Sequence, residues 1–362
     1  MNSTTKINLD VGVIKNLDLS KFKNILVLTG VQYSNNVFES VIKPKIKGKI
    51  HLFPNIPVNP TDSLIYRIVS FASDKKIDCI LSIGGKDVMD CGRFLSFLLP
   101  QGGPLPEYLM GGKKGPQGIT DNVIYHITVP VVCSLGAEIS DMASFFMNKR
   151  KVFVASPYLM PKVTYIDPQL MQGLPYKLWA SMSVGVFGYA VSAYTSRFAN
   201  PTSDSFAEEA LKKYITVAPE LIRNPNNLEY IKQVEVASIN AFLAVRMSSF
   251  GAIQAIADML SAKFNFLYGI AQAVVCAEVC ERSYQSNKAK FDKILKMLGG
   301  RDIKTAVKKF IDRLSVDLPP LKGKIDKSNV DAFARECFNY KIEGNPKVLT
   351  PKEVTEILVS LP

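Results

Sequence analysis

Apolar residues in the first part of the chain occur in short continuous runs separated by segments with a helical period. One continuous apolar run, at 25–30, ends in Thr29-Gly30, and two further short strands are predicted at 50–53 and 78–83. Short runs that are apolar throughout are typical of strands buried on both faces of a parallel sheet. Between them, residues 61–73 carry apolar side chains at the spacing of an amphipathic helix.

The pattern continues with two glycines, Gly84-Gly85, and a predicted helix at 88–99, followed by a loop at 102–121 that is rich in Gly, Pro and Lys. The remaining predicted strands are 123–132, broken at Pro130, 152–156 and 163–166. The succession of strand, helix, strand, glycines and helix predicts a mostly parallel, doubly wound α/β domain that binds a nucleotide.

The β pattern stops at Asp167-Pro168, because a proline excludes helical geometry from the residue before it. A long apolar helix is predicted from about Leu178, with no charge between Lys177 and Arg197. Its serines, threonines, glycines and tyrosines favour a buried core helix over a membrane span. Further helices are predicted at 206–217, 228–249, 252–262, 270–283, 288–298, 303–314, 329–337 and 351–361. We therefore predict an α/β domain at 1–168 and an all-helical domain at 169–362.

Composition adds few restrictions. The chain has 362 residues, 47% of them hydrophobic and 21% charged, which suits two globular domains. Six scattered cysteines indicate no disulfide framework, and the first 22 residues lack a signal peptide, so we expect a reduced, cytoplasmic protein. The net charge of +12 comes largely from lysines mixed with acidic residues on helix-like segments, so we expect neither a nucleic acid nor a membrane as a partner.

A set of residues around the domain boundary carries a family resemblance. Asp167-Pro168, Leu174-Pro175, Ala180, Ala193-Tyr194, Asp204 and Ala207 resemble the middle of the iron-dependent (group III) alcohol dehydrogenases, which share their fold with glycerol dehydrogenase and dehydroquinate synthase. The resemblance covers about residues 25–283. It implies a dinucleotide-binding α/β domain, a helical domain and an active-site cleft between the two.

The metal ligands of that family are missing from this sequence. The resemblance places the family's ligand positions, an Asp and three His, on Gly185, Tyr189, Gln254 and Tyr268, and the His near the substrate on Asp258. These four ligand positions offer no imidazole and no carboxylate, so we expect no metal. The two histidines of the chain lie in the sheet domain.

The glycine-rich turn of the family is partly kept. Gly84, Gly85 and Asp90 match, while Lys86 and Asp87 replace a Gly and a Ser. Glycines before a helix N-terminus let backbone N–H groups approach a pyrophosphate. A plain strand-to-helix turn with Asp87 as N-cap is the alternative interpretation.

Two further segments resemble the family's cofactor site. Val131, Val132 and Leu135 stand where the family has hydroxyl residues, and Lys151 matches a family lysine near the cofactor. Near Thr29 and Gly30 many family members carry an Asp that binds the ribose. Its absence favours NADP over NAD, although Gly30 also suits a simple turn.

The resemblance therefore implies a metal-independent, NAD(P)-dependent oxidoreductase for an alcohol or carbonyl substrate. Asp258, Tyr189, Tyr268 and Gln254 are the candidate catalytic residues, because phenols and a carboxylate can carry acid–base chemistry. The alternative is a redox-inactive member in which these groups only plug the metal pocket and the cleft serves a non-redox reaction or binding. We expect a small-molecule substrate, such as one from a tailoring pathway, and a homodimer.

Overall fold

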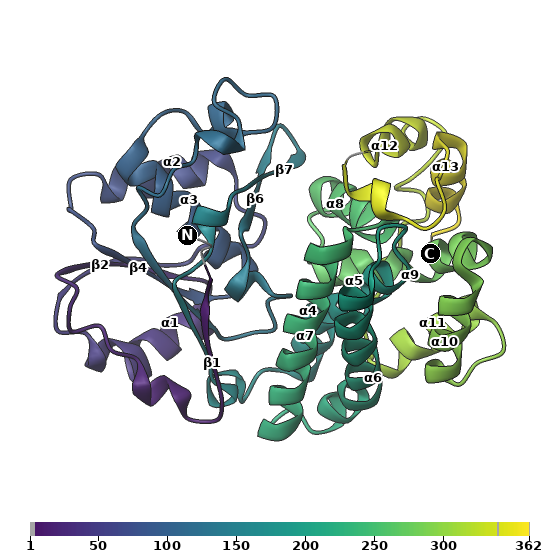
Figure 1. Ribbon diagram of the computed structural model, residues 1–362, viewed down its shortest axis with the longest axis horizontal. Helices are drawn as coiled ribbons and strands as arrows, with labels where there is room; N and C mark the ends of the chain where they lie inside the picture. The colour runs from purple at the N-terminus through teal and green to yellow at the C-terminus, as the bar shows by residue number, and fades with distance from the viewer. Residues whose placement is uncertain (1–3, 339, 362) are drawn as a thin grey trace. The chain divides into compact units, whose positions relative to one another are not determined.

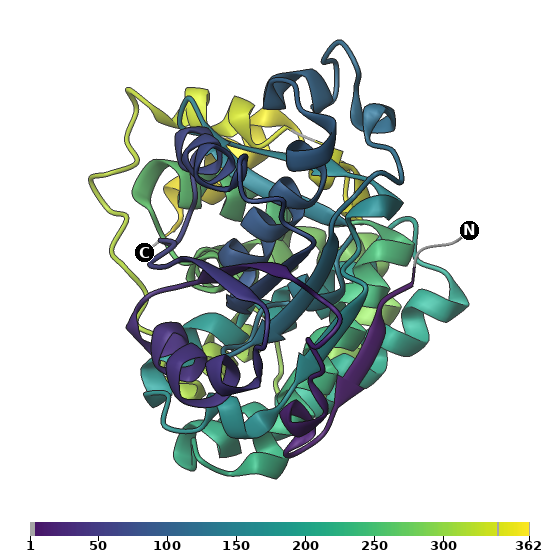
Figure 2. The same ribbon diagram turned by 90° about the vertical axis from the view of Figure 1, so that its left-hand side faces the viewer.

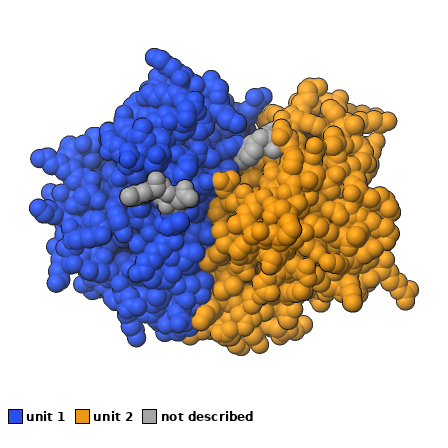
Figure 3. Space-filling model, in the orientation of Figure 1, with its two compact units in different colours: residues 1–172 blue, residues 173–362 orange. Residues whose placement is uncertain are grey.

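The structure, a computed structural model, describes residues 4–338 and 340–361 and divides into two compact units, Met1–Gln172 and Gly173–Pro362 (Figure 3). Every described strand belongs to unit 1, and unit 2 is built from helices. The predicted fold class, an α/β domain followed by an all-helical one, is confirmed.

Unit 1 is organised around a six-stranded parallel sheet with the strand order β1-β8-β5-β4-β2-β3. A separate antiparallel pair is formed by β6 and β7. The strands are β1 (Lys6–Leu9), β2 (Asn24–Thr29), β3 (Lys49–Phe53), β4 (Cys79–Gly84), β5 (Tyr125–Pro130), β6 (Met142–Met147), β7 (Arg150–Ala155) and β8 (Val163–Ile166).

Helices cover both faces of the sheet because successive residues of a strand point to opposite sides. Along β2, Leu26 and Leu28 join the core beneath α2 (Asp62–Ala72) and α3 (Lys86–Gln101). Ile25 and Val27 join the core on the other face, with α1 (Gln32–Val37) and the π-helical turn that follows it. Figure 1 shows α2 and α3 on one side of β2 and β4, and α1 on the other.

Unit 2 is a bundle of helices. They are α4 (Tyr176–Ser183), α5 (Gly185–Thr195), α6 (Pro201–Arg223), α7 (Leu228–Ser248), α8 (Ala252–Phe264), α9 (Tyr268–Ser283), α10 (Lys288–Leu298), α11 (Ile303–Arg313), α12 (Val330–Glu336) and α13 (Pro351–Val359). Every residue of α5 is buried, as predicted for a core helix.

The long helix predicted from Leu178 is in fact two helices, α4 and α5, which meet at Val184. Among the described residues no single helix has the length and apolarity of a membrane span; only α7 and α8 taken together do, and they are bent by 109°.

The short strands β1 and β6 and the short helix α1 were not predicted, and neither were the 3-10 and π-helical turns. Strand β1 is an edge strand that pairs with β8, which lies at the opposite end of unit 1 in the sequence (Figure 2, purple arrow). Strand β6 contains no β-branched residue and is defined by its pairing with β7. Such elements are specified by their partners rather than by local preference.

Candidate active site

The carboxyl ends of the central strands bring the predicted cofactor residues together. Thr29 at the end of β2 lies in register with Ile83 of β4, so Gly30 and Gly84 occupy the same sheet edge. The chain passes from β2 to β3 on one side and places β4 on the other. This reversal is a topological switch point, where open α/β sheets bind ligands outside the carboxyl ends of their strands.

The glycines at this edge allow close backbone approach. A Cβ on Gly84 would lie 2.6 Å from Cγ2 of Val88, and one on Gly30 would lie 3.1 Å from Oγ of Ser34. Gly85 is the N-cap of α3 and makes no side-chain cap, so the first N–H groups of this 16-residue helix receive no bond from a capping side chain. These features fit a dinucleotide pyrophosphate, whose charge the helix N-terminus favours.

Asp87 does not cap the helix, so the alternative interpretation as an N-cap is wrong: the cap is Gly85 and Asp87 lies in the first turn. Burial raises the pKa of the Asp87 carboxyl, with the nearby Lys86 acting in the opposite direction. The carboxyl therefore repels an anion less at lower pH than at higher pH.

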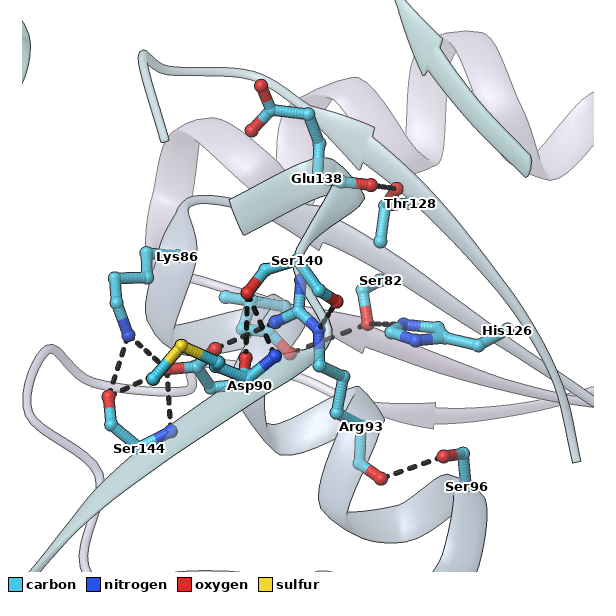
Figure 4. Close-up of polar contacts among 12 residues, drawn as sticks. Ser82, Lys86, Asp90, Arg93, Ser96, His126, Thr128, Glu138, Ser140 and Ser144 are labelled. Carbon is cyan, nitrogen blue, oxygen red and sulfur yellow. Dashed lines mark hydrogen bonds and ion pairs between the residues drawn. The ribbon is translucent and has the colours of Figure 1, made fainter. Parts of the chain in front are cut away.

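Lys86 is tied back to the protein. Its ammonium binds the Asp90 carboxylate and donates a 2.7 Å hydrogen bond to Oγ of Ser144 (Figure 4). Asp90 also accepts from the backbone N–H of Ser144 at 3.0 Å and from Nη1 of Arg93 at 2.7 Å. Both Asp90 and Lys86, predicted as cofactor residues, thus join α3 to β6 in this structure.

The other predicted cofactor residues lie at the end of β2, on the segment after β5 and on β7. The Thr29 hydroxyl donates to the side chain of Asn35. Val131, after β5, donates its N–H to the Gly84 carbonyl at 3.2 Å, and Leu135 is held in the left-handed region at φ 54°. The Lys151 ammonium lies 5.9 Å from the Phe146 ring. Val132 follows Val131 and is partly buried.

Glu138 is a buried acid in the short 3-10 turn Ala137–Ile139 that follows β5. Its side chain is fully buried, and among the described residues no other residue donates a hydrogen bond to either carboxyl oxygen. Figure 4 shows the carboxyl pointing away from Thr128 and Arg93. Burial raises its pKa to about 7, and its own backbone N–H and the Arg93 charge oppose that rise.

Unit 2 contains a buried ion pair at the predicted catalytic position. Asp258 of α8 binds the ammonium of Lys341 through Oδ2, and the two side chains are only 9% and 8% exposed. The ammonium lies 5.0 Å from the ring centre of Phe250 and 5.6 Å from that of Tyr268. The Tyr189 ring lies 5.5 Å from Phe250 and 6.4 Å from Tyr268. Two of the predicted catalytic residues, Asp258 and Tyr268, therefore lie beside a cation that the sequence did not reveal, and Tyr189 packs against the rings of Phe250 and Tyr268.

Gln254, the fourth predicted catalytic residue, uses its amide to hold helices together. Its Nε2 donates to the Gly188 carbonyl and to Oε1 of Gln272, each at 3.0 Å, and its Oε1 accepts from the N–H of Gly251 at 3.0 Å. A Cβ on Gly188 would lie 2.5 Å from Oε1 of Gln272. Gln254 thus joins α5, α8 and α9 at a point where a glycine permits close packing.

A divalent metal ion does not fit these side chains. Gly185, Tyr189, Gln254 and Tyr268 supply no thiolate, imidazole or carboxylate, the ligands of tightly bound iron or zinc. In the described parts of the chain no three His, Cys, Asp or Glu side chains gather as a metal site would require. The ammonium of Lys341 already pairs with Asp258, the nearby carboxylate.

Comparison with known proteins identifies the class. Residues 5–168 match the model of the iron-containing alcohol dehydrogenases, and residues 179–361 match the C-terminal model of the same family. The chain therefore belongs to the iron-containing alcohol dehydrogenase family, whose members are oxidoreductases that act on alcohols.

Individual relatives agree with that assignment. The chain is 22% identical to the NAD-dependent methanol dehydrogenase of Bacillus methanolicus, over 93% of this chain and 91% of that protein. It is 25% identical to the 1,3-propanediol dehydrogenase of Klebsiella pneumoniae, over 75% of this chain and 71% of that protein. The iron-containing alcohol dehydrogenase of Thermococcus thioreducens has the same fold, with a TM-score of 0.87, 21% identity and coverage of 98% and 97%. The structure of the sulfoacetaldehyde reductase of Bifidobacterium kashiwanohense, solved with NAD+, also has this fold. Its TM-score is 0.84 at 17% sequence identity, and the match covers 99% of this chain and 98% of that one.

Proposed function

We propose that this protein is an NAD(P)-dependent oxidoreductase that interconverts an alcohol and the corresponding carbonyl compound without a catalytic metal ion. The observation that carries the proposal is the topological switch point at the carboxyl ends of β2 and β4, where the 16-residue helix α3 begins directly after Gly84 and Gly85 without a capping side chain. The NAD dependence of the Bacillus methanolicus relative and the NAD+ bound to the Bifidobacterium kashiwanohense enzyme support a nicotinamide cofactor.

The cofactor, when bound, supplies or accepts the hydride. The chain's own residues bind the cofactor and transfer the proton to or from the substrate oxygen. Gly84, Gly85 and the first N–H groups of α3 would hold the pyrophosphate, and the negative charge of Asp87 would weaken that interaction. No carboxylate stands at Gly30 to repel a 2′-phosphate, which favours NADP over NAD.

Oxidation of an alcohol removes a hydride from carbon and a proton from oxygen, and reduction adds both. Tyr189 and Tyr268 have phenols that can donate a hydrogen bond to the substrate oxygen, the task that a metal would otherwise perform. Asp258, which pairs with the Lys341 ammonium, is the candidate acid–base group that exchanges the proton with the substrate oxygen. Gln254 acts as a positioning residue, because it fixes α8 against α5 and α9.

We infer metal independence from the kinds of side chain that the family's ligand positions carry in this sequence. Iron or zinc prefers imidazole, thiolate or carboxylate, and the family's ligand positions hold Gly185, Tyr189, Gln254 and Tyr268 instead. A cation entering beside Asp258 also meets the ammonium of Lys341. Substrate positioning and electrostatics then rest on side chains alone.

Calorimetric titration tests cofactor binding: the purified full-length protein is titrated with NAD+, NADP+ and their reduced forms. Turnover of a panel of alcohols and aldehydes is then measured with and without EDTA. We expect dinucleotide binding, turnover that EDTA does not abolish, and less than about 0.1 equivalent of iron or zinc in the dialysed protein. About one equivalent of metal that EDTA removes together with the activity would contradict metal independence. No binding at millimolar dinucleotide would favour the redox-inactive alternative.

The NADP preference has its own test. Gly30→Asp restores a carboxylate at the end of β2, where a Cβ would meet Oγ of Ser34 at 3.1 Å, a contact that a small shift relieves. The variant should lose about tenfold in affinity for NADP+ relative to NAD+. An unchanged ratio of the two affinities would mean that the ribose does not lie against Gly30.

A further inference from the structure

We propose that the ammonium of Lys341 is the permanent positive charge of the active site and takes the place of the metal ion. This inference rests on the proposed oxidoreductase function and adds a catalytic residue to it. Lys341 lies in a short 3-10 turn, Tyr340–Gly344, far along the chain from the helices it contacts, and no motif points to it.

The first argument is location. The ammonium lies 5.6 Å from the ring of Tyr268, and the Tyr268 ring lies 6.4 Å from that of Tyr189. Positions 189 and 268 are two of the family's ligand positions, and Asp258, the direct partner of the ammonium, stands at the substrate-side position. The lysine charge thus sits among the side chains that would otherwise surround a metal.

The second argument is energetic. Burying an ammonium is unfavourable unless a counter-ion and further favourable contacts compensate for the lost hydration. Here Asp258 supplies the counter-ion, and the faces of Phe250 and Tyr268 supply cation–π attraction. A hydrophobic side chain could fill the same space without the cost of desolvating a charge, so stability alone does not explain a buried ammonium here.

The third argument is chemical. When a carbonyl is reduced, its carbon gains a hydride from NAD(P)H and the π electron pair of the C=O bond moves to oxygen, which then takes up a proton. The net reaction converts the carbonyl compound, NAD(P)H and H+ into the alcohol and NAD(P)+. A fixed cation stabilises the negative charge that develops on oxygen, and oxidation runs through the same charged state in reverse.

The competing interpretation is that the pair is a structural plug. Four variants separate the two: Lys341→Met, Lys341→Arg, the double variant Lys341→Met/Asp258→Asn, and Lys263→Met as a matched control. Lys263 makes the same kinds of contact, a 2.8 Å ion pair with Glu336 and a ring contact of 5.6 Å with Phe333, but outside the candidate site.

Lys341→Met should lower kcat by about a hundredfold or more while the affinity for NADPH is unchanged, and Lys341→Arg should keep a larger share of kcat. The double variant should regain the melting temperature lost in Lys341→Met without regaining kcat. Lys263→Met should keep wild-type kcat. A double variant that is as stable and as active as the wild type would overturn the proposal.

A second measurement does not depend on turnover. In the background Tyr189→His/Tyr268→His, which restores two family ligands, zinc affinity is measured by calorimetry with Lys341 present and with Lys341→Met added. If the ammonium occupies the metal's place, removing it should tighten zinc binding by about tenfold or more, since charge repulsion is lost and Asp258 is released. Equal zinc affinity in both proteins would overturn the proposal even if the wild type catalyses no redox reaction.

Discussion

Arg93 donates a 2.7 Å hydrogen bond from Nη1 to Oδ1 of Asp90, and both side chains are buried. The second oxygen of Asp90 accepts from the backbone and hydroxyl of Ser144 and binds Lys86. A carboxylate with all these partners holds α3 against β6. Asp87, three residues earlier, stands in the first turn of the same helix. The two acids therefore have different roles, although the sequence suggested both as cofactor residues.

The role of Asp90 can be tested through stability. Asp90→Asn leaves the buried guanidinium of Arg93 without its counter-ion, so the free energy of unfolding should fall by about 3–5 kcal/mol. Urea denaturation measures this. Asp74→Asn is the control, because Asp74 also pairs with a lysine but is 80% exposed, and its removal should change stability by less than about 1 kcal/mol. Equal effects of the two variants would refute the structural role.

Asp87 should instead control cofactor affinity. Asp87→Ser removes a negative charge beside the N-terminus of α3 and restores the family's residue, so NADP+ should bind about tenfold more tightly. Because burial raises the pKa of Asp87, the gain should grow as the pH rises and the wild-type carboxyl ionises. Calorimetry at two pH values measures it. Asp62→Ser, in the first turn of α2, is the matched control and should leave binding unchanged.

Tyr189 should affect turnover without affecting the fold. Tyr189→Phe keeps the ring contacts with Phe250 and Tyr268 and removes only the phenolic hydroxyl. We therefore expect kcat to fall on the order of a hundredfold while the melting temperature is nearly unchanged. Tyr194→Phe, which removes another hydroxyl from the same helix, is the control and should keep full activity. Full activity of Tyr189→Phe would remove Tyr189 from the catalytic set.

Asp258→Asn should affect stability as well as activity, because Asp258 is the partner of a buried cation. It too should abolish most activity, but it leaves the ammonium of Lys341 buried without its counter-ion. We therefore expect a loss of stability as well as of kcat. The double variant Lys341→Met/Asp258→Asn should recover the stability, which separates the two effects.

Glu138 should make stability depend on pH. Its folded-state pKa of about 7 lies above the ordinary value of 4.5, so the fold favours the neutral acid. The stabilisation is complete below pH 4.5 and is lost as the pH rises to about 7. Glu138→Gln cannot ionise, so its unfolding free energy relative to wild type should increase across this window by up to about 3 kcal/mol. Urea denaturation at pH 5 and pH 8 measures the difference; a constant difference would mean that the carboxyl ionises normally.

The sequence by itself determined the elements and the family. Continuous apolar runs located β2, β4 and β8 within a residue or two, and the helical period located most of unit 2, because burial on one or both faces is written directly in residue spacing. The glycines at Gly84-Gly85 were likewise evident from residue type alone. The placement of the family's metal-ligand positions on Gly185, Tyr189, Gln254 and Tyr268 follows from the resemblance and stays a prediction.

Only the tertiary structure decided which partner each polar group takes. Asp90 and Lys86 look like cofactor residues in sequence and form an internal network with Arg93 and Ser144 in the fold. Lys341 comes 83 residues after Asp258 and carries no local signal, yet the fold pairs them in a buried site. Hydrophobic periodicity specifies which face of an element is buried, whereas hydrogen bonds and ion pairs depend on which elements meet there, and that is fixed by long-range packing.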